Sequence, residues 1–85
     1  MKYTLIHPDG KREEASWVKP TLEQLQNAVG GYIERVRLPG NAYMYVNEDG
    51  MSLNLPFNPH VNHLWPGGVL GVAIVATPSN WKGQL

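Results

Sequence analysis

The chain has 85 residues, in which seven Lys and Arg balance seven Asp and Glu and no cysteine occurs. One small domain of this length usually needs support from disulfides, a metal or self-association, and the lack of cysteine excludes disulfides and thiolate metal sites. Zero net charge provides no field to attract nucleic acid or an anionic membrane, so we expect a homo-oligomer without general nucleic-acid binding.

The N-terminal residues predict a hairpin. Residues 2–6 and 13–18 are rich in strand formers, and residues 7–10 between them carry turn chemistry. The first strand is too short to be a secretory signal, and no apolar run in the chain approaches the ~20 residues that span a bilayer. We therefore expect a cytoplasmic protein without membrane association.

A helix is predicted next. Thr21 and Gln24 match a capping box, in which each side chain satisfies the backbone N–H of the other residue. Apolar residues recur at helical spacing through residues 22–29, and Gly30 can adopt the left-handed conformation that ends a helix. The expected helix has about two and a half turns.

The rest of the chain predicts mainly strands. Residues 32–38 and 42–47 read as a second hairpin around a turn at 39–41, and residues 52–55 as a short extended piece. Neither strand of the hairpin is apolar on one side only, which indicates that its outer face is also covered by a loop, a ligand or another subunit. The apolar run at 69–76 predicts a fully buried central strand.

The segment 55–65 holds the most distinctive residues. Asn58 followed by Pro59 is typical of a helix start, because Asn caps the first turn and proline has no N–H to leave unpaired. A short helix is expected there, and residues 78–85 are expected to be a loosely held tail. The whole predicts a single α+β domain over 1–77: a mostly antiparallel sheet of about five to six strands with one main helix and one short helix, both helices on one face.

Four motifs add a resemblance. They are VGGYIE at 29–34, MYVNEDG at 44–50, LPFNP at 55–59 followed by LW at 64–65, and a glycine-bounded, valine-rich strand. In this order they resemble a family of small uncharacterised domains of actinobacteria, their bacteriophages and mobile elements. The resemblance covers roughly residues 20–76 and implies a phage or actinobacterial context. This chain has His60 where members typically carry Arg.

Metal binding is not favoured by the histidines. His60 and His63 have a spacing that can present two imidazoles to one metal, and His7 is the only third imidazole. A closed site needs three or four ligands, and cysteine is absent. We expect solvent-facing histidines, no metal and no cofactor.

Catalysis is not favoured either. A nucleophilic serine in a Gly-x-Ser-x-Gly elbow is absent. Glu34, Glu48 and Asp49 could act as acids or bases, but the last two suit a turn, and Glu34 suits an ion pair or a cross-strand contact. We expect a protein that is not an enzyme.

Aromatic and arginine side chains indicate recognition of a ligand. Tyrosines, Trp65 and two arginines can stack on a base and pair with a phosphate, and asparagines can bond to a sugar or base. The predicted ligand-binding residues are Tyr32, Arg35, Arg37, Tyr45, Asn47, Asn58, His60 and Trp65.

The predicted function is therefore non-enzymatic binding. The first hypothesis is a phage-encoded protein that sequesters a nucleotide-derived signal of host defence, in the cytoplasm of a bacterial host, within a homo-oligomer. The alternative is a protein-interaction module that inhibits or modulates a host protein through an exposed strand edge or the region of Trp65 and Trp81.

Overall fold

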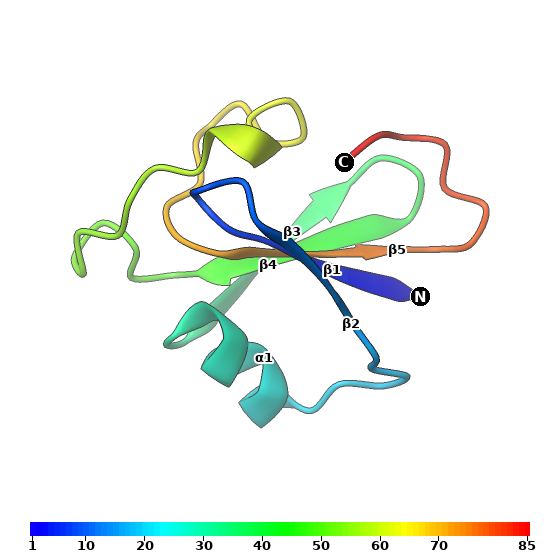
Figure 1. The fold of residues 1–85 in the computed structure, drawn as a ribbon, viewed down its shortest axis with the longest axis horizontal. Helices are drawn as coiled ribbons and strands as arrows, with labels where there is room; N and C mark the ends of the chain where they lie inside the picture. The colour runs from blue at the N-terminus through cyan, green and yellow to red at the C-terminus, as the bar shows by residue number, and fades with distance from the viewer.

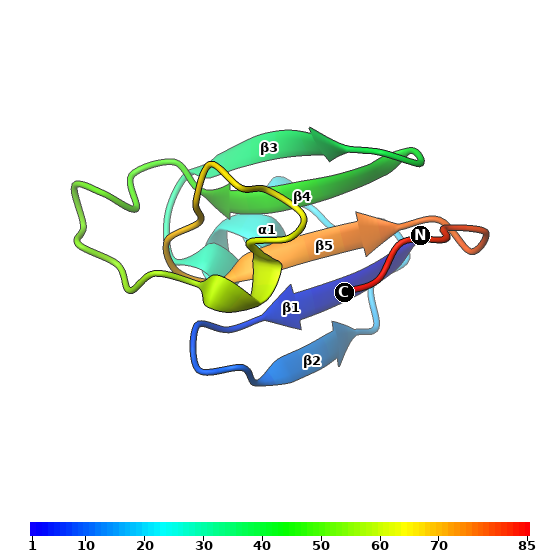
Figure 2. The same cartoon turned by 90° about the horizontal axis from the view of Figure 1, so that it is seen from above.

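The computed structural model describes all 85 residues and contains one five-stranded antiparallel sheet with strand order β2-β1-β5-β4-β3 (Figures 1 and 2). The strands are β1 (Lys2–Ile6), β2 (Arg12–Ala15), β3 (Ile33–Leu38), β4 (Ala42–Asn47) and β5 (Ala73–Thr77). The predicted α+β class and the antiparallel sheet are confirmed.

The central strand is β5, the last to appear in the sequence. It lies between β1 and β4, and all five of its residues are buried. This confirms the buried central strand, although it starts at Ala73, later than expected. Gly71, two residues before β5, has a φ of +86°, and its N–H donates to the Pro56 carbonyl at 2.7 Å beside an isolated bridge of Phe57 with Leu70. The backbone there therefore pairs within the loop between β4 and β5 and does not belong to the central strand.

One face of the sheet carries the helix α1 (Leu22–Val29), as expected from its capping box. The Thr21 hydroxyl accepts from the Gln24 N–H at 3.1 Å, and the Gln24 side chain accepts from the Thr21 N–H at 2.9 Å. Leu25 and Val29 pack against Ile74 of β5. No helix in the structure is long and apolar enough to cross a membrane.

The opposite face is covered by the long β4–β5 loop, which contains the 3-10 turn η1 (Pro59–Val61). Val61 is fully buried and joins Met44 and Val75 in the larger core cluster. Figure 1 shows α1 and η1 on opposite sides of the sheet, so the expectation that both helices share one face is wrong. The apolar side chain of Val61 is buried in the larger core cluster, and this contact holds η1 on the face opposite α1.

Residues 78–85, for which the sequence predicted loose attachment, run back across this same face. Trp81 and Leu85 pack against the larger core cluster. The Trp81 indole donates to the Pro39 carbonyl at 3.0 Å.

Two sequence predictions of strands need correction. Residues 52–55 are not extended: Leu53 and Leu55 donate backbone bonds at 2.9 Å to Asp49 and Gly50, and Asn54 has a φ of +54°, which makes this segment a compact turn. The strand expected over 13–18 ends at Ala15.

We expect the cap of α1 to contribute measurably to stability. Thr21→Ala removes the hydroxyl that accepts from Gln24 and should lower the free energy of unfolding in urea by about 1 kcal/mol. Ser79→Ala, at an exposed serine outside the helices and strands, is the matched control. An unchanged stability of Thr21→Ala would contradict the role of the cap.

Candidate functional site

Asn58 ties three segments together inside the protein. Its side chain is fully buried, and its amide nitrogen donates to the carbonyl oxygens of Ile6 at 2.9 Å and Gly71 at 3.0 Å. Its side-chain oxygen accepts the backbone N–H of His60 at 3.1 Å, which is the cap bond of η1. The side-chain amide of this predicted ligand residue is therefore occupied by hydrogen bonds within the fold.

His60 and Trp65 lie in the same loop. The His60 ring is half-buried against the β1–β2 turn, where a Cβ built on Gly10 would lie 3.2 Å from His60 Cε1. Trp65 is 41% exposed, beside Gly67. Both residues belong to the loop that covers the face opposite α1, so they do not form one pocket with groups on the α1 face.

Asn47 is a second buried asparagine with a structural contact. Its amide nitrogen donates to the Val29 carbonyl at 3.1 Å, and its oxygen accepts the Asp49 N–H at 2.8 Å. A Cβ at Gly31 would lie only 2.9 Å from the Asn47 nitrogen, so glycine is needed for this approach. Asn47 thus joins the end of β4 to the end of α1.

The remaining predicted residues meet on the α1 face of β3 and β4. In the register of these strands Arg35 lies opposite Tyr45, and Arg37 lies opposite Tyr43, which places all four side chains on one face. The Arg35 guanidinium lies over the Tyr43 ring, 4.8 Å from its centre. We call Arg35, Arg37, Tyr43 and Tyr45 the arginine–tyrosine surface.

This surface is open and carries unpaired positive charge. Both arginines are exposed and both tyrosines are half-buried. The three ion pairs of the protein all lie elsewhere, among Lys2, Glu14, His7, Lys11 and Glu13. Arg35 and Arg37 are therefore free to pair with an anion from outside.

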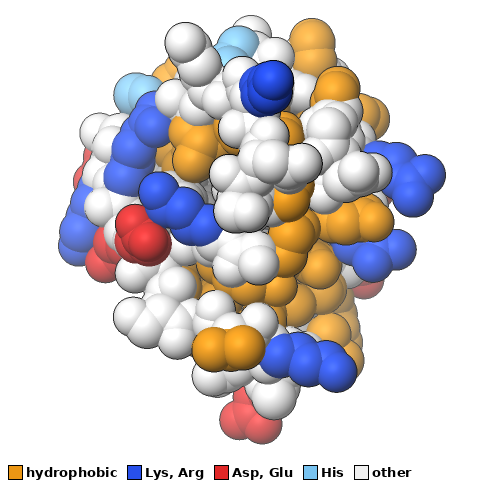
Figure 3. Space-filling model, turned by 90° about the vertical axis from the view of Figure 1, so that its right-hand side faces the viewer, with side chains coloured by type: hydrophobic (Ala, Val, Ile, Leu, Met, Phe, Trp, Pro, Cys, Tyr) orange, Lys and Arg blue, Asp and Glu red, His pale blue; other side chains and the backbone are white.

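Two further aromatic rings lie on the same face of the sheet: Tyr3, which is buried in the smaller core cluster, and Trp17, which packs against that cluster. Tyr3 on β1 contacts Trp17 edge-on, with ring centres 5.8 Å apart. Burial, and then the neighbouring Tyr45, raise the pKa of the Tyr3 hydroxyl. Figure 3 shows a continuous apolar stripe at the end of the molecule where β1 starts and β5 ends, with basic side chains on both sides.

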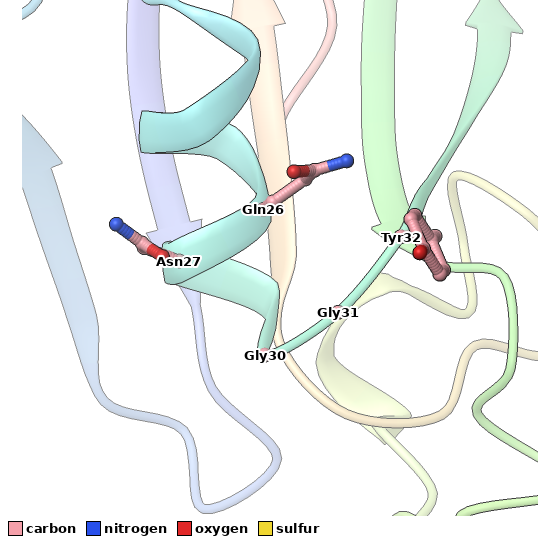
Figure 4. Close-up of a pocket in the computed structure, with 5 residues that line it drawn as sticks. All are labelled: Gln26, Asn27, Gly30, Gly31 and Tyr32. Carbon is pink, nitrogen blue, oxygen red and sulfur yellow. The ribbon is translucent and has the colours of Figure 1, made fainter.

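Tyr32 lies apart, at a shallow hollow of about 330 Å³ beyond the C-terminal end of α1. Gln26, Asn27, Gly30, Gly31 and Tyr32 line it. In Figure 4 the Gln26 side chain extends from the helix on the side of Tyr32, and Asn27 points away. The hollow offers amides and a 65% exposed tyrosine, without carboxylate, imidazole or amine.

The three histidines are separated. His7 bonds to the Glu13 carboxylate at 2.9 Å, His63 bonds to the Gln84 carbonyl at 2.8 Å, and His60 lies against Gly10. No group of three or more His, Asp or Glu side chains lies close enough to hold a metal ion. The His-x-x-His spacing therefore does not bring a ligand set together.

The structure thus divides the eight predicted residues. It brings together Arg35, Arg37 and Tyr45, and adds Tyr43, Tyr3 and Trp17, which the predicted set lacked. Tyr43 and Tyr45 are two residues apart on one strand, so the alternation of side chains in the sequence places them on one face. Only the sheet order brings Tyr3 near them, because β1 and β4 both pair with β5.

The comparisons with known proteins give one match. A family model described as a domain of unknown function (DUF3846) aligns with residues 1–82. No curated protein and no solved structure matches the chain.

Asn58 should be far more important for stability than its neighbour Asn62. Asn58→Ala leaves the buried carbonyls of Ile6 and Gly71 without their donor and should cost about 3 kcal/mol of unfolding free energy. Asn62→Ala, at an exposed asparagine of the same loop, should change it by less than about 0.5 kcal/mol. Similar losses for the two variants in urea unfolding would refute the tethering role.

Acid should weaken the β1–β2 hairpin through Glu13. The hydrogen bond from His7 has the largest effect in lowering the pKa of Glu13 from its usual 4.5. The hydrogen bond from Lys11 and the positive charge of Lys11 lower it further. A carboxylate whose pKa is lower in the folded than in the unfolded state stabilises the fold at pH above its unfolded-state pKa. This stability is lost as the pH falls through its folded-state pKa. Glu13→Gln should therefore lose less unfolding free energy than the parent between neutral pH and about pH 3.

The control for this pH dependence is Glu48→Gln, at an exposed carboxylate outside the three ion pairs. An identical acid-induced loss in Glu13→Gln and in the parent protein would show that the hairpin pair is energetically silent.

Proposed function

Because the chain belongs to the DUF3846 family, a domain family of unknown function, we propose from its geometry that it is a non-enzymatic binding protein for a small anionic ligand with an aromatic ring. The arginine–tyrosine surface receives the ligand. Its arginines pair with phosphate groups and its tyrosines stack on a base, which matches the chemistry of a nucleotide-derived molecule.

One observation carries this proposal: two arginines lie beside two tyrosines on one face without any carboxylate partner. An acid directly opposite an arginine on the neighbouring strand would stabilise the sheet, which is the arrangement that suits a purely structural role. Here the residues opposite are tyrosines, and Arg35 is already oriented over a ring. The cation–π contact holds the guanidinium in place before a ligand arrives.

The ligand is enclosed when a second copy of the chain covers it. None of the three hollows is lined by Arg35 or Arg37, so one copy presents an open face. Tight binding of a small ligand requires burial of most of its surface. Two such faces repel through their four arginines, and an anionic ligand between them offsets that repulsion. We therefore propose a homo-oligomer that forms around its ligand.

Sequestration is the activity that fits such a site. A sequestering protein needs tight binding without turnover, and desolvated aromatic and arginine contacts supply it. The resemblance to domains of actinobacteria, their phages and mobile elements supports the narrower proposal of a phage protein that removes a nucleotide-derived defence signal in the bacterial cytoplasm.

A second candidate, a protein-interaction module directed at a host protein, is favoured by the open edge of β3. Opposite residues of an antiparallel pair have their side chains on the same face. If β3 paired symmetrically with β3 of a second copy, a pairing centred on Glu34 would place Glu34 opposite Glu34. A pairing centred on residue 35, 36 or 37 would place arginine opposite arginine. The edge thus resists its own copy and is open to a different strand.

Calorimetry tests the ligand proposal with a panel of cyclic mononucleotides, cyclic dinucleotides and cyclic ADP-ribose isomers. At least one should bind at micromolar concentration, and Arg37→Ala should weaken it by about 1.5 to 3 kcal/mol, because a charge-assisted contact is lost. Arg12→Ala, at an exposed arginine on the opposite edge strand, should leave the affinity unchanged. Binding by no member of the panel would overturn the proposal.

Native mass and lysate capture separate the two candidates. A nucleotide released on denaturation, with assembly that depends on it, supports sequestration. A stoichiometric host protein that is retained after dialysis of small molecules supports the interaction module instead.

A further inference from the structure

The largest hollow of the protein, about 460 Å³, lies between the β3–β4 turn, the segment after η1 and the C-terminal residues. Figures 1 and 2 show the C-terminal segment at the same end of the molecule as this turn. Its floor includes Leu38, which packs in the larger core cluster, away from the arginine–tyrosine surface. The residues that line it are Leu38, Pro39, Gly40, His63, Leu64, Trp81, Lys82, Gly83 and Gln84.

Hydrogen bonds hold both walls of the hollow in place. The Trp81 indole donates to the Pro39 carbonyl at 3.0 Å, and the His63 ring bonds to the Gln84 carbonyl at 2.8 Å. Gly40 permits the close approach of the indole, because a Cβ there would lie 2.9 Å from Trp81 Cδ1. The hollow is therefore built before anything enters it, which lowers the entropic cost of binding.

The lining combines an apolar surface with basic groups. Leu38, Leu64 and Trp81 supply aliphatic and aromatic contacts. Lys82 carries a positive charge, whereas none of the nine lining residues is acidic. This charge complementarity selects an anion over a cation, and the apolar walls select an organic body over an inorganic ion.

We propose that this hollow is a second binding site, for a small organic anion with a flat apolar body, such as an aromatic carboxylate. The carboxylate lies toward Lys82, and the ring lies against Trp81 and Leu64. The volume is within the range of about 300 to 1,000 Å³ typical of small-molecule sites. The site is independent of the proposed nucleotide ligand, because it uses neither Arg35 nor Arg37.

Titration with phenylacetate, followed by ¹H–¹⁵N NMR of the full chain, tests this site. We expect saturable shifts of the Trp81 indole N–H and of backbone amides near Gly40 and Leu64. Phenylacetamide, a neutral analogue of the same shape, should bind about five-fold more weakly. Lys82→Gln should lower the affinity for phenylacetate by a similar factor, and Lys19→Gln, at an exposed lysine on the β2–α1 connection, should not.

Three outcomes would overturn the proposal. They are the absence of a saturable shift at about 10 mM phenylacetate, shifts confined to residues outside the hollow, and equal affinities for phenylacetate and phenylacetamide. Repeating the titration with Arg37→Ala separates this site from the nucleotide site, since the phenylacetate shifts should persist in that variant.

Discussion

The amide of Asn58 joins parts of the chain that are far apart in sequence. It bonds to the last residue of β1, to the loop that leads into β5 and to the first turn of η1. These three contacts fix where the β4–β5 loop lies on the sheet and so place Val61 in the core. The position of the C-terminal segment depends on the same arrangement, because Trp81 packs against the core that the loop completes. A buried amide has this influence because its lost hydrogen bonds cannot be replaced by water.

The two faces of the sheet consequently have different properties. The long loop and the C-terminal segment cover one face, and their junction leaves a hollow with fixed walls. The eight-residue helix α1 covers only part of the other face, and the uncovered part presents tyrosines and free arginines. A short helix on a five-stranded sheet thus creates the open surface to which we assign binding.

Local signals predicted most of the fold and few of the site contacts. The α1 capping box, the Asn58-Pro59 start of η1 and the buried β5 all follow from neighbouring residues and were predicted. The extended piece at 52–55 was wrong, because its turn depends on backbone bonds to Asp49 and Gly50 and on a left-handed Asn54. In the predicted site, Asn47 and Asn58 are polar residues of loop-like stretches, and the sequence does not reveal that their amides bond to Val29, Ile6 and Gly71.

The sequence by itself determined the fold class, the main helix, the strands of the two hairpins and the absence of cysteine chemistry, because each rests on composition or on residues close along the chain. Only the tertiary structure decided which side chains meet. Because β5 lies between β1 and β4, Tyr3 is aligned with the tyrosines of β4. Residues 78–85 run back across the sheet and form one wall of the largest hollow. Both depend on pairings between distant residues, whose register is set by packing of the whole sheet and not by any local pattern.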